Sequence, residues 1–183
     1  MILGLDVSTS CTGWCLIEEK NSKLVDIGFI SLEKHKGVYS KAKIVERVLQ
    51  DILVGHLVEK VFIEENLQAF RPGLSSAKTL STLARFNGIV SLLCYQTFEL
   101  EPIHLNVNAA RKSLGIKIER QSKCGKSTKE QVVEWASGEL KDFLWPTKVL
   151  KSGKRKGLEI LDPVSYDMAD AYVISRAGVA LEQ

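Results

Sequence analysis

The sequence lacks any long hydrophobic segment and contains few cysteines or histidines. No apolar run approaches the roughly 18 residues that a membrane-spanning helix requires, so we expect no membrane partner. The chain has 4 cysteines and 3 histidines among 183 residues. The cysteines form neither a CxxC pair nor a zinc spacing with histidine, so we expect reduced thiols in an intracellular protein. Met1 leads directly into "ILGLDVS" without a basic segment, and we therefore expect no secretory signal.

The remaining composition is that of an ordinary globular protein. Apolar residues make up 45% of the chain, charged residues 26% and aromatic residues 7%. A chain of this length can bury one substantial core, so we expect residues 1–183 to form a single domain. The expected location is intracellular, in the cytoplasm or nucleoid, an organelle matrix or a virus-infected cell.

Charge is distributed unevenly along the chain. Residues 104–157 carry thirteen Lys/Arg and five Asp/Glu, a net charge of +8, whereas the rest carry twelve and seventeen, a net charge of −5. A basic region beside an acidic one indicates a surface that docks a polyanion next to a site rich in carboxylates. The alternative is a charged face that is only solvated.

Turn residues and hydrophobic periodicity predict an α/β fold. Strands are expected at 2–8, 11–19, 23–32, 60–66 and 101–107, and helices at 41–59, 75–98, 108–116, 127–145 and from about 164 towards the C-terminus. Asp162, or alternatively Ser165, is the expected N-cap of the last helix. This order predicts a mixed five-stranded sheet, with three antiparallel strands followed by parallel strands, and with helices on both faces.

Four acidic residues fall where such a sheet would bring them together. Asp6 lies at the end of the first strand, on the same face as Ile2 and Gly4, and Glu64 lies at the end of the fourth. Open α/β sheets place their sites at this carboxyl edge. Asp167 and Asp170 are one helical turn apart in "YDMADAYVIS", and a last helix packed across the edge would add both.

Clustered carboxylates repel one another, and each raises the pKa of its neighbours. Mg²⁺ relieves this repulsion, because it prefers oxygen ligands and commonly bridges to phosphate. Two such ions can activate a water and stabilise the leaving oxygen of a phosphodiester, so acids beside a basic flank predict a metal-dependent nuclease. For each acid alone a simpler explanation stays open. Asp6 could cap a turn, Glu64 could end a solvated strand, and Asp167 with Asp170 could form an exposed helix face.

Three segments, "GLDVSTSCTGW", "VFIEEN" and "YDMADAYVIS", together resemble the RuvC family of Holliday junction resolvases, in the RNase H-like superfamily. The family pattern is a strand Asp, a strand Glu and a D-x-x-D on the last helix. Asp6, Glu64, Asp167 and Asp170 match it in order, over almost the whole chain. The resemblance implies an endodeoxyribonuclease of DNA recombination and repair, a homodimer that resolves four-way junctions and other branched DNA by paired nicks. It also implies two Mg²⁺ ions per active site, for which Mn²⁺ is expected to substitute.

The resemblance further implies basic residues that hold phosphates near the scissile bond. Lys129, in "TKEQVV", matches one such position, and Arg111 or Lys112, in "AARKSLG", lies near another. Lys126, just before the same helix as Lys129, is included among the expected DNA contacts. The family also has an aromatic residue soon after the strand Glu that stacks on bases, and Phe70 is the aromatic available for it here, with ordinary packing as the alternative.

A basic segment, "PTKVLKSGKRKG", precedes the last helix and is predicted to be a loop. Its five cations are Lys148, Lys151, Lys154, Arg155 and Lys156. We expect Lys154, Arg155 and Lys156 to bind phosphates of all branched substrates alike, because such contacts position DNA without reading its bases. The alternative is again a solvated loop.

Small residues recur at helical spacing in the predicted helix 75–98, at Ala77, Ser81, Ala84, Gly88 and Ser91. Such a stripe lets another backbone approach closely, either the sheet of the same subunit or a partner helix. Because symmetric nicking needs two active sites, we predict a twofold-symmetric dimer to which this helix contributes.

Two motifs resemble nucleotide-binding loops, but neither is complete. "CGKST" lacks the first glycine of a phosphate-binding loop, because that position is Arg120. "GLDVSTSCTGW" also resembles the phosphate loop of sugar kinases and Hsp70-like ATPases, but those proteins usually need two such subdomains. Two alternatives stay open: a nuclease of the same fold that acts on flaps, forks or structured RNA, and a catalytically silent junction-binding module.

Overall fold

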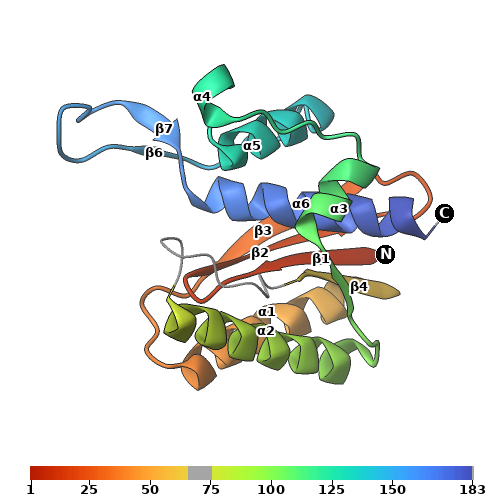
Figure 1. Ribbon diagram of the computed structural model, residues 1–183. Coiled ribbons are helices and arrows are strands. Elements are labelled where there is room, and N and C mark those ends of the chain that lie inside the picture. Colours follow the sequence, from red (N-terminus) through yellow and green to blue (C-terminus); the bar gives the residue numbers. More distant parts are fainter. Residues whose placement is uncertain (66–75, 183) are drawn as a thin grey trace.

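The computed structural model describes residues 1–65 and 76–182 (Figure 1). The strands are β1 (Ile2–Val7), β2 (Cys11–Ile17), β3 (Leu24–Ser31), β4 (Lys60–Glu64), β5 (Ile103–Leu105), β6 (Thr147–Val149) and β7 (Glu159–Leu161). The helices are α1 (Val38–Gly55), α2 (Ala77–Phe98), α3 (Val107–Ser113), α4 (Gln121–Cys124), α5 (Thr128–Glu139) and α6 (Val164–Leu181). No helix among these is both long and apolar enough to cross a membrane.

The main sheet has five strands in the order β3-β2-β1-β4-β5. β1, β2 and β3 pair antiparallel, and β4 and β5 continue the sheet parallel to β1. This arrangement confirms the predicted mixed sheet. Because β1 and β4 are parallel neighbours, with Leu5 opposite Ile63, their carboxyl ends lie at the same edge.

Helices cover both faces of the sheet, as predicted (Figure 1). α1 and α2 lie on one face, while α6 lies on the other, with α3 and α5 packed against it. Successive side chains of a strand point to opposite faces, which divides the core into two clusters. On β1, Ile2 packs with the α6 side, whereas Leu3 and Leu5 pack with α1 and α2. Asp6 therefore points towards α6.

Two glycines let α6 lie directly on the sheet. A Cβ atom at Gly13 would come 2.0 Å from the Asp167 carbonyl oxygen, and one at Gly4 would come 2.6 Å from that of Ala171. Neither position has room for a larger residue. The close approach brings the first turns of α6 to the carboxyl edge of β1.

The segment before α6 differs from the expectation. β6 and β7 form an antiparallel hairpin, with Lys148 opposite Ile160, that projects from the body of the molecule (Figure 1). The prediction that residues 146–157 form a loop is therefore wrong at Thr147–Val149, which form β6. Val149 and Leu158 are exposed in this arm, so no burial pattern marked the strands, and the lysine-rich turn dominated the sequence signal. α6 begins at Val164 with Pro163 as its N-cap, so the expected N-caps Asp162 and Ser165 are both wrong. Asp162, one residue before the cap, still accepts a hydrogen bond from the Val164 backbone NH at 3.2 Å through its Oδ1.

Candidate active site

The four acidic residues meet at the carboxyl edge of the sheet. Asp6 lies near the end of β1 and Glu64 ends β4. Asp167 and Asp170 come from the first two turns of α6, which crosses the same edge. All four line one cavity of about 1280 Å³. The structure thus brings together the acids that the sequence singled out, while their catalytic role stays a prediction.

Burial and mutual repulsion raise the pKa values of Asp6, Glu64 and Asp170. Burial, followed by the charges of Glu64 and Asp170, raises the pKa of Asp6 well above its usual value. Burial and the charge of Asp170 raise the pKa of Glu64 to about 7. Burial also raises the pKa of Asp170, although the adjacent Arg111 opposes the change. The site therefore holds more negative charge than its surroundings stabilise.

Two cations partly balance this charge. Arg111, on α3, donates from Nη2 to Asp170 Oδ1 at 3.1 Å, and its side chain is only 15% exposed. Lys129, on α5, donates from Nζ to Asp167 Oδ1 at 3.2 Å and is 55% exposed. The start of α5 is fixed by a capping box between Ser127 and Glu130, which holds Lys129 over the acids.

The donor chemistry of the site fits a hard divalent cation. Carboxylate oxygens are the ligands that Mg²⁺ and Mn²⁺ prefer, and an added cation would remove the repulsion that raises the pKa values of Asp6 and Glu64. Within residues 1–65 and 76–182, no three His, Cys, Asp or Glu side chains are grouped closely enough to hold an ion as they stand. Asp167 and Asp170 face Lys129 and Arg111 instead. Ion binding would therefore compete with these two ion pairs.

The remaining residues expected to bind DNA lie in different surroundings. Lys112 is exposed on α3, and Lys126 forms an ion pair with Glu134 at 2.6 Å. Lys154, Arg155 and Lys156 lie in the exposed turn of the β6–β7 hairpin. Phe70 lies outside the described residues. Only Lys129 and Arg111, of the described basic residues expected to contact DNA, line the acidic cavity.

Several cavity residues were not singled out from the sequence. Ser8, Thr9 and Ser10 form the β1–β2 turn, which had been read only as a break between strands. Phe29, on β3, and Tyr166, on α6, add aromatic rings to the wall. Tyr166 directly precedes Asp167, and that adjacency was the available signal. No feature of the sequence marked Phe29, because its position in the cavity depends on how the strands pair.

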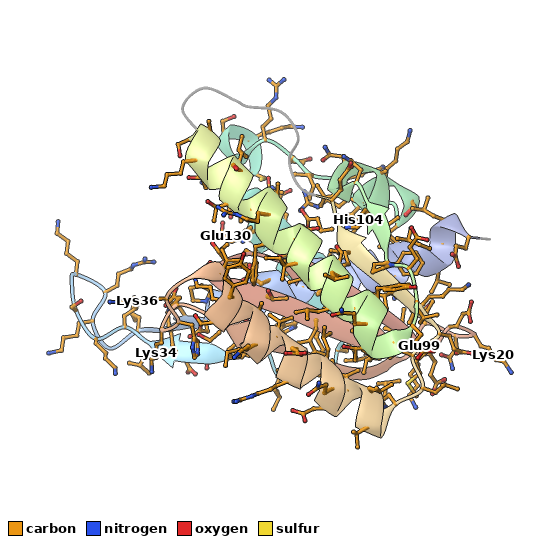
Figure 2. The ribbon with its side chains drawn as sticks, turned by 90° about the horizontal axis from the view of Figure 1, so that it is seen from below. Lys20, Lys34, Lys36, Glu99, His104 and Glu130 are labelled. Carbon is orange, nitrogen blue, oxygen red and sulfur yellow. The ribbon has the colours of Figure 1, made fainter. Side chains whose placement is uncertain are left out.

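One buried residue of α2 supports the strand that carries Glu64. Asn87 is 3% exposed and donates from Nδ2 to the Glu64 backbone carbonyl at 3.1 Å. The Nε2 atom of His104, a residue labelled in Figure 2, lies within hydrogen-bond distance of Asn87 Oδ1, at 3.2 Å. These contacts tie β4 and β5 to α2 at the carboxyl edge. In the sequence Asn87 is one polar residue within a helical apolar pattern, and nothing in that pattern indicated its contact with the Glu64 carbonyl.

A mixed sheet in this order, with α6 packed across it, is an RNase H-like fold. Solved structures with the fold include Thermus thermophilus RuvC in complex with a Holliday junction substrate, with a TM-score of 0.65, 14% identity and coverage of 99% of this chain and 93% of that one. A second Thermus thermophilus RuvC structure has a TM-score of 0.60, 16% identity and coverage of 99% and 94%. The yeast mitochondrial Holliday junction resolvase Ydc2 has a TM-score of 0.58, 15% identity and coverage of 98% and 77%. At these identities the likeness establishes the fold.

Sequence similarity points to the same group. The crossover junction endodeoxyribonuclease RuvC of Clostridioides difficile (strain 630) is 28% identical over 96 residues, which are 51% of this chain and 54% of that protein. The match thus spans about half the length of the curated relative. No protein-family model matches the chain. The chain is RuvC-like in fold and, over this part, in sequence.

Proposed function

We propose that this protein is a metal-dependent endodeoxyribonuclease that resolves Holliday junctions by paired symmetric nicks. The observation that carries the proposal is the convergence of Asp6, Glu64, Asp167 and Asp170 in one cavity beside Lys129 and Arg111. The RuvC-like fold and the partial sequence similarity support the same activity.

In this proposal Asp6, Glu64, Asp167 and Asp170 hold Mg²⁺, with Mn²⁺ as a substitute. When bound, the ions would activate a water and stabilise the charge on the leaving oxygen. Lys129 is the mobile cation of the site, because its half-exposed ammonium can leave Asp167 for a phosphate oxygen of the substrate. Arg111 is buried against Asp170 and keeps that carboxylate oriented. In this proposal Arg111 acts mainly by orienting Asp170, and the DNA contact expected of it stays a prediction.

A substrate panel tests the proposed activity. Labelled four-way junction, linear duplex, flap and fork are incubated with the protein and Mg²⁺. The proposal predicts that the junction is cut fastest. Faster cleavage of the flap or fork would favour a nuclease of the same fold with another preference, and tight junction binding without any cleavage would favour the silent module.

The exposed surface of α2 supports a dimer. Ala77, Ser81, Ala84 and Gly88 are exposed, and a Cβ atom at Gly88 would meet nothing within 4 Å. The opposite side of α2 is the side that packs into its own core, through buried residues such as Phe86. Leu92 and Tyr95 continue the exposed side with 54% and 55% exposure. Four of the five small residues thus face away from the sheet, whereas Ser91 is half-buried and forms a hydrogen bond with His104. We propose that the exposed part of this stripe packs on α2 of a second copy.

The β6–β7 hairpin is proposed to hold a DNA arm. Its turn carries Lys151, Lys154, Arg155 and Lys156, all exposed. Figure 2 shows side chains along the hairpin extending clear of the body, on the same side of the molecule as Lys34 and Lys36. Lys148, at the base of the hairpin, lines the acidic cavity. DNA that reaches the acids therefore passes close to this arm.

A further inference from the structure

The cavity that contains the acids extends well beyond them. It is also lined by the β1–β2 turn, with the hydroxyl groups of Ser8 and Ser10. Further lining residues are Phe29 on β3, Tyr166 and Pro163 at the start of α6, and Lys148 at the base of the hairpin. One continuous cavity thus has an acidic end and an aromatic end.

Strand pairing places Phe29 in line with Asp6. Asp6 is opposite Gly13, and Gly13 is opposite Phe29. Paired residues of neighbouring strands point to the same face, so Asp6 and Phe29 both face α6. Two strand spacings separate their backbones by about 10 Å. A nucleotide adjacent to a phosphate held at the acids can span this distance by passing around the start of α6, where Pro163 and Tyr166 line the same cavity.

Packing does not account for the position of Phe29. Its side chain is 41% exposed, and it belongs to neither of the two hydrophobic clusters of the described residues. Gly13, its neighbour in the same row, is covered by the α6 backbone at Asp167, so the first turn of α6 lies between Asp6 and Phe29. Tyr166, by contrast, packs partly against the cluster on the α6 side. Phe29 therefore presents an open aromatic surface inside the cavity.

We infer that the aromatic end of this cavity is a nucleobase subsite, which takes an unpaired base of the strand cut at the acidic end. Aromatic rings bind bases by stacking, and this contact tolerates any base identity. Lys148 supplies a cation for the adjacent phosphate at the same wall. A base reaches such a surface only when it leaves its own stack, which costs least where pairing is already disturbed. The subsite would therefore favour cutting near a branch point.

The inference rests on the proposed nuclease activity, and two variants of Phe29 test it. Phe29→Leu keeps an apolar side chain but removes the ring, and Phe29→Trp restores a stacking surface. Leu57→Ala is the control, because Leu57 is 75% exposed and follows α1, away from the cavity. Junction affinity is measured without divalent cations, so that no DNA is cut. Thermal melting of each variant checks that it is folded.

We expect Phe29→Leu to weaken junction binding about tenfold, because stacking on one aromatic ring typically contributes that much. Phe29→Trp should restore the affinity, and binding of linear duplex should be unchanged in both. In parallel, 5-iodouracil placed next to the cut site should photocrosslink to Phe29 or Tyr166. A folded Phe29→Leu protein that binds and cuts junctions like wild type, with crosslinks elsewhere, would overturn the subsite and leave the nuclease proposal intact. Crosslinking to Phe29 by a wild-type protein that cuts nothing would overturn the nuclease proposal and retain the subsite.

Discussion

At the scale of single residues, Arg111 and Lys112 show how neighbours in the sequence diverge in the structure. Either one was expected near a DNA phosphate, and Arg111 is buried in an ion pair with Asp170 while Lys112 is exposed. Arg111 Nε is also buried, with no hydrogen-bond partner among the described residues. Helical periodicity could separate the two positions but could not show which one faced the acids. That choice depends on how α3 packs on α6.

This difference predicts that alanine substitutions at the two positions affect different properties of the protein. Arg111→Ala leaves Asp170 buried without its counter-ion and should lower the free energy of unfolding by about 3 kcal/mol in metal-free buffer. Lys112→Ala, one position along the helix, should leave the urea midpoint unchanged and affect mainly DNA affinity. Urea denaturation of both variants provides the measurement. Equal midpoints for the two variants would contradict the internal role of Arg111.

Glu64 predicts how stability depends on pH in the absence of metal. The pKa of Glu64 is about 7 in the folded protein, above the ordinary glutamate value of 4.5 that applies in the unfolded chain. Between these values the folded state binds more protons than the unfolded state, so the free energy of unfolding should fall as pH rises from about 4.5 to 7. Glu64→Gln, which cannot ionise, should flatten this decline. The measurement is urea denaturation of both proteins at pH 5 and pH 8 in chelator. A wild-type protein that loses no more stability between these pH values than Glu64→Gln would refute the prediction.

At the scale of elements, the strands and helices that form the core were the most predictable. β1 and α6 carry strong signals, because one alternates between two buried faces and the other is a long run of small and apolar residues. The β6–β7 hairpin was missed as strands, since it has little core to bury. The contact of Asn87 with the Glu64 carbonyl could not be predicted either, because it joins residues 23 positions apart.

The hairpin predicts a salt-dependent contribution to DNA binding. Replacing Lys154, Arg155 and Lys156 with Ala should weaken binding to all branched substrates alike, because phosphate contacts carry no sequence information. The slope of log affinity against log salt should flatten by about one unit for each lost contact. The cleavage sequence preference should not change. The measurement is the junction affinity of wild type and the triple variant from low to moderate salt. Equal affinities and parallel plots of log affinity against log salt would show that the hairpin does not bind DNA phosphates.

At the scale of the whole molecule, the predicted mixed sheet is confirmed and the four acids meet as expected. The sequence supported these expectations because strand order and acid positions follow from local patterns. The association of two copies is a different matter, since an exposed stripe of small residues shows where a partner fits but not that it binds. We predict a dimer at micromolar concentration by light scattering. Only monomer, with and without junction DNA, would count against the role proposed for α2.

The central claim is that the four acids form the cutting centre, and mapping nicks in a four-way junction tests it most directly. Each strand is labelled in turn, and cleavage is compared for wild type, Asp6→Asn, Glu64→Gln, Asp167→Asn and Asp170→Asn in Mg²⁺. The account predicts that wild type cuts two opposite strands at the same distance from the branch point. Each variant should lose most of this cleavage and still bind the junction, because the Lys/Arg surface provides affinity. Asp167→Asn and Asp170→Asn proteins that both cut at near wild-type rate would contradict it.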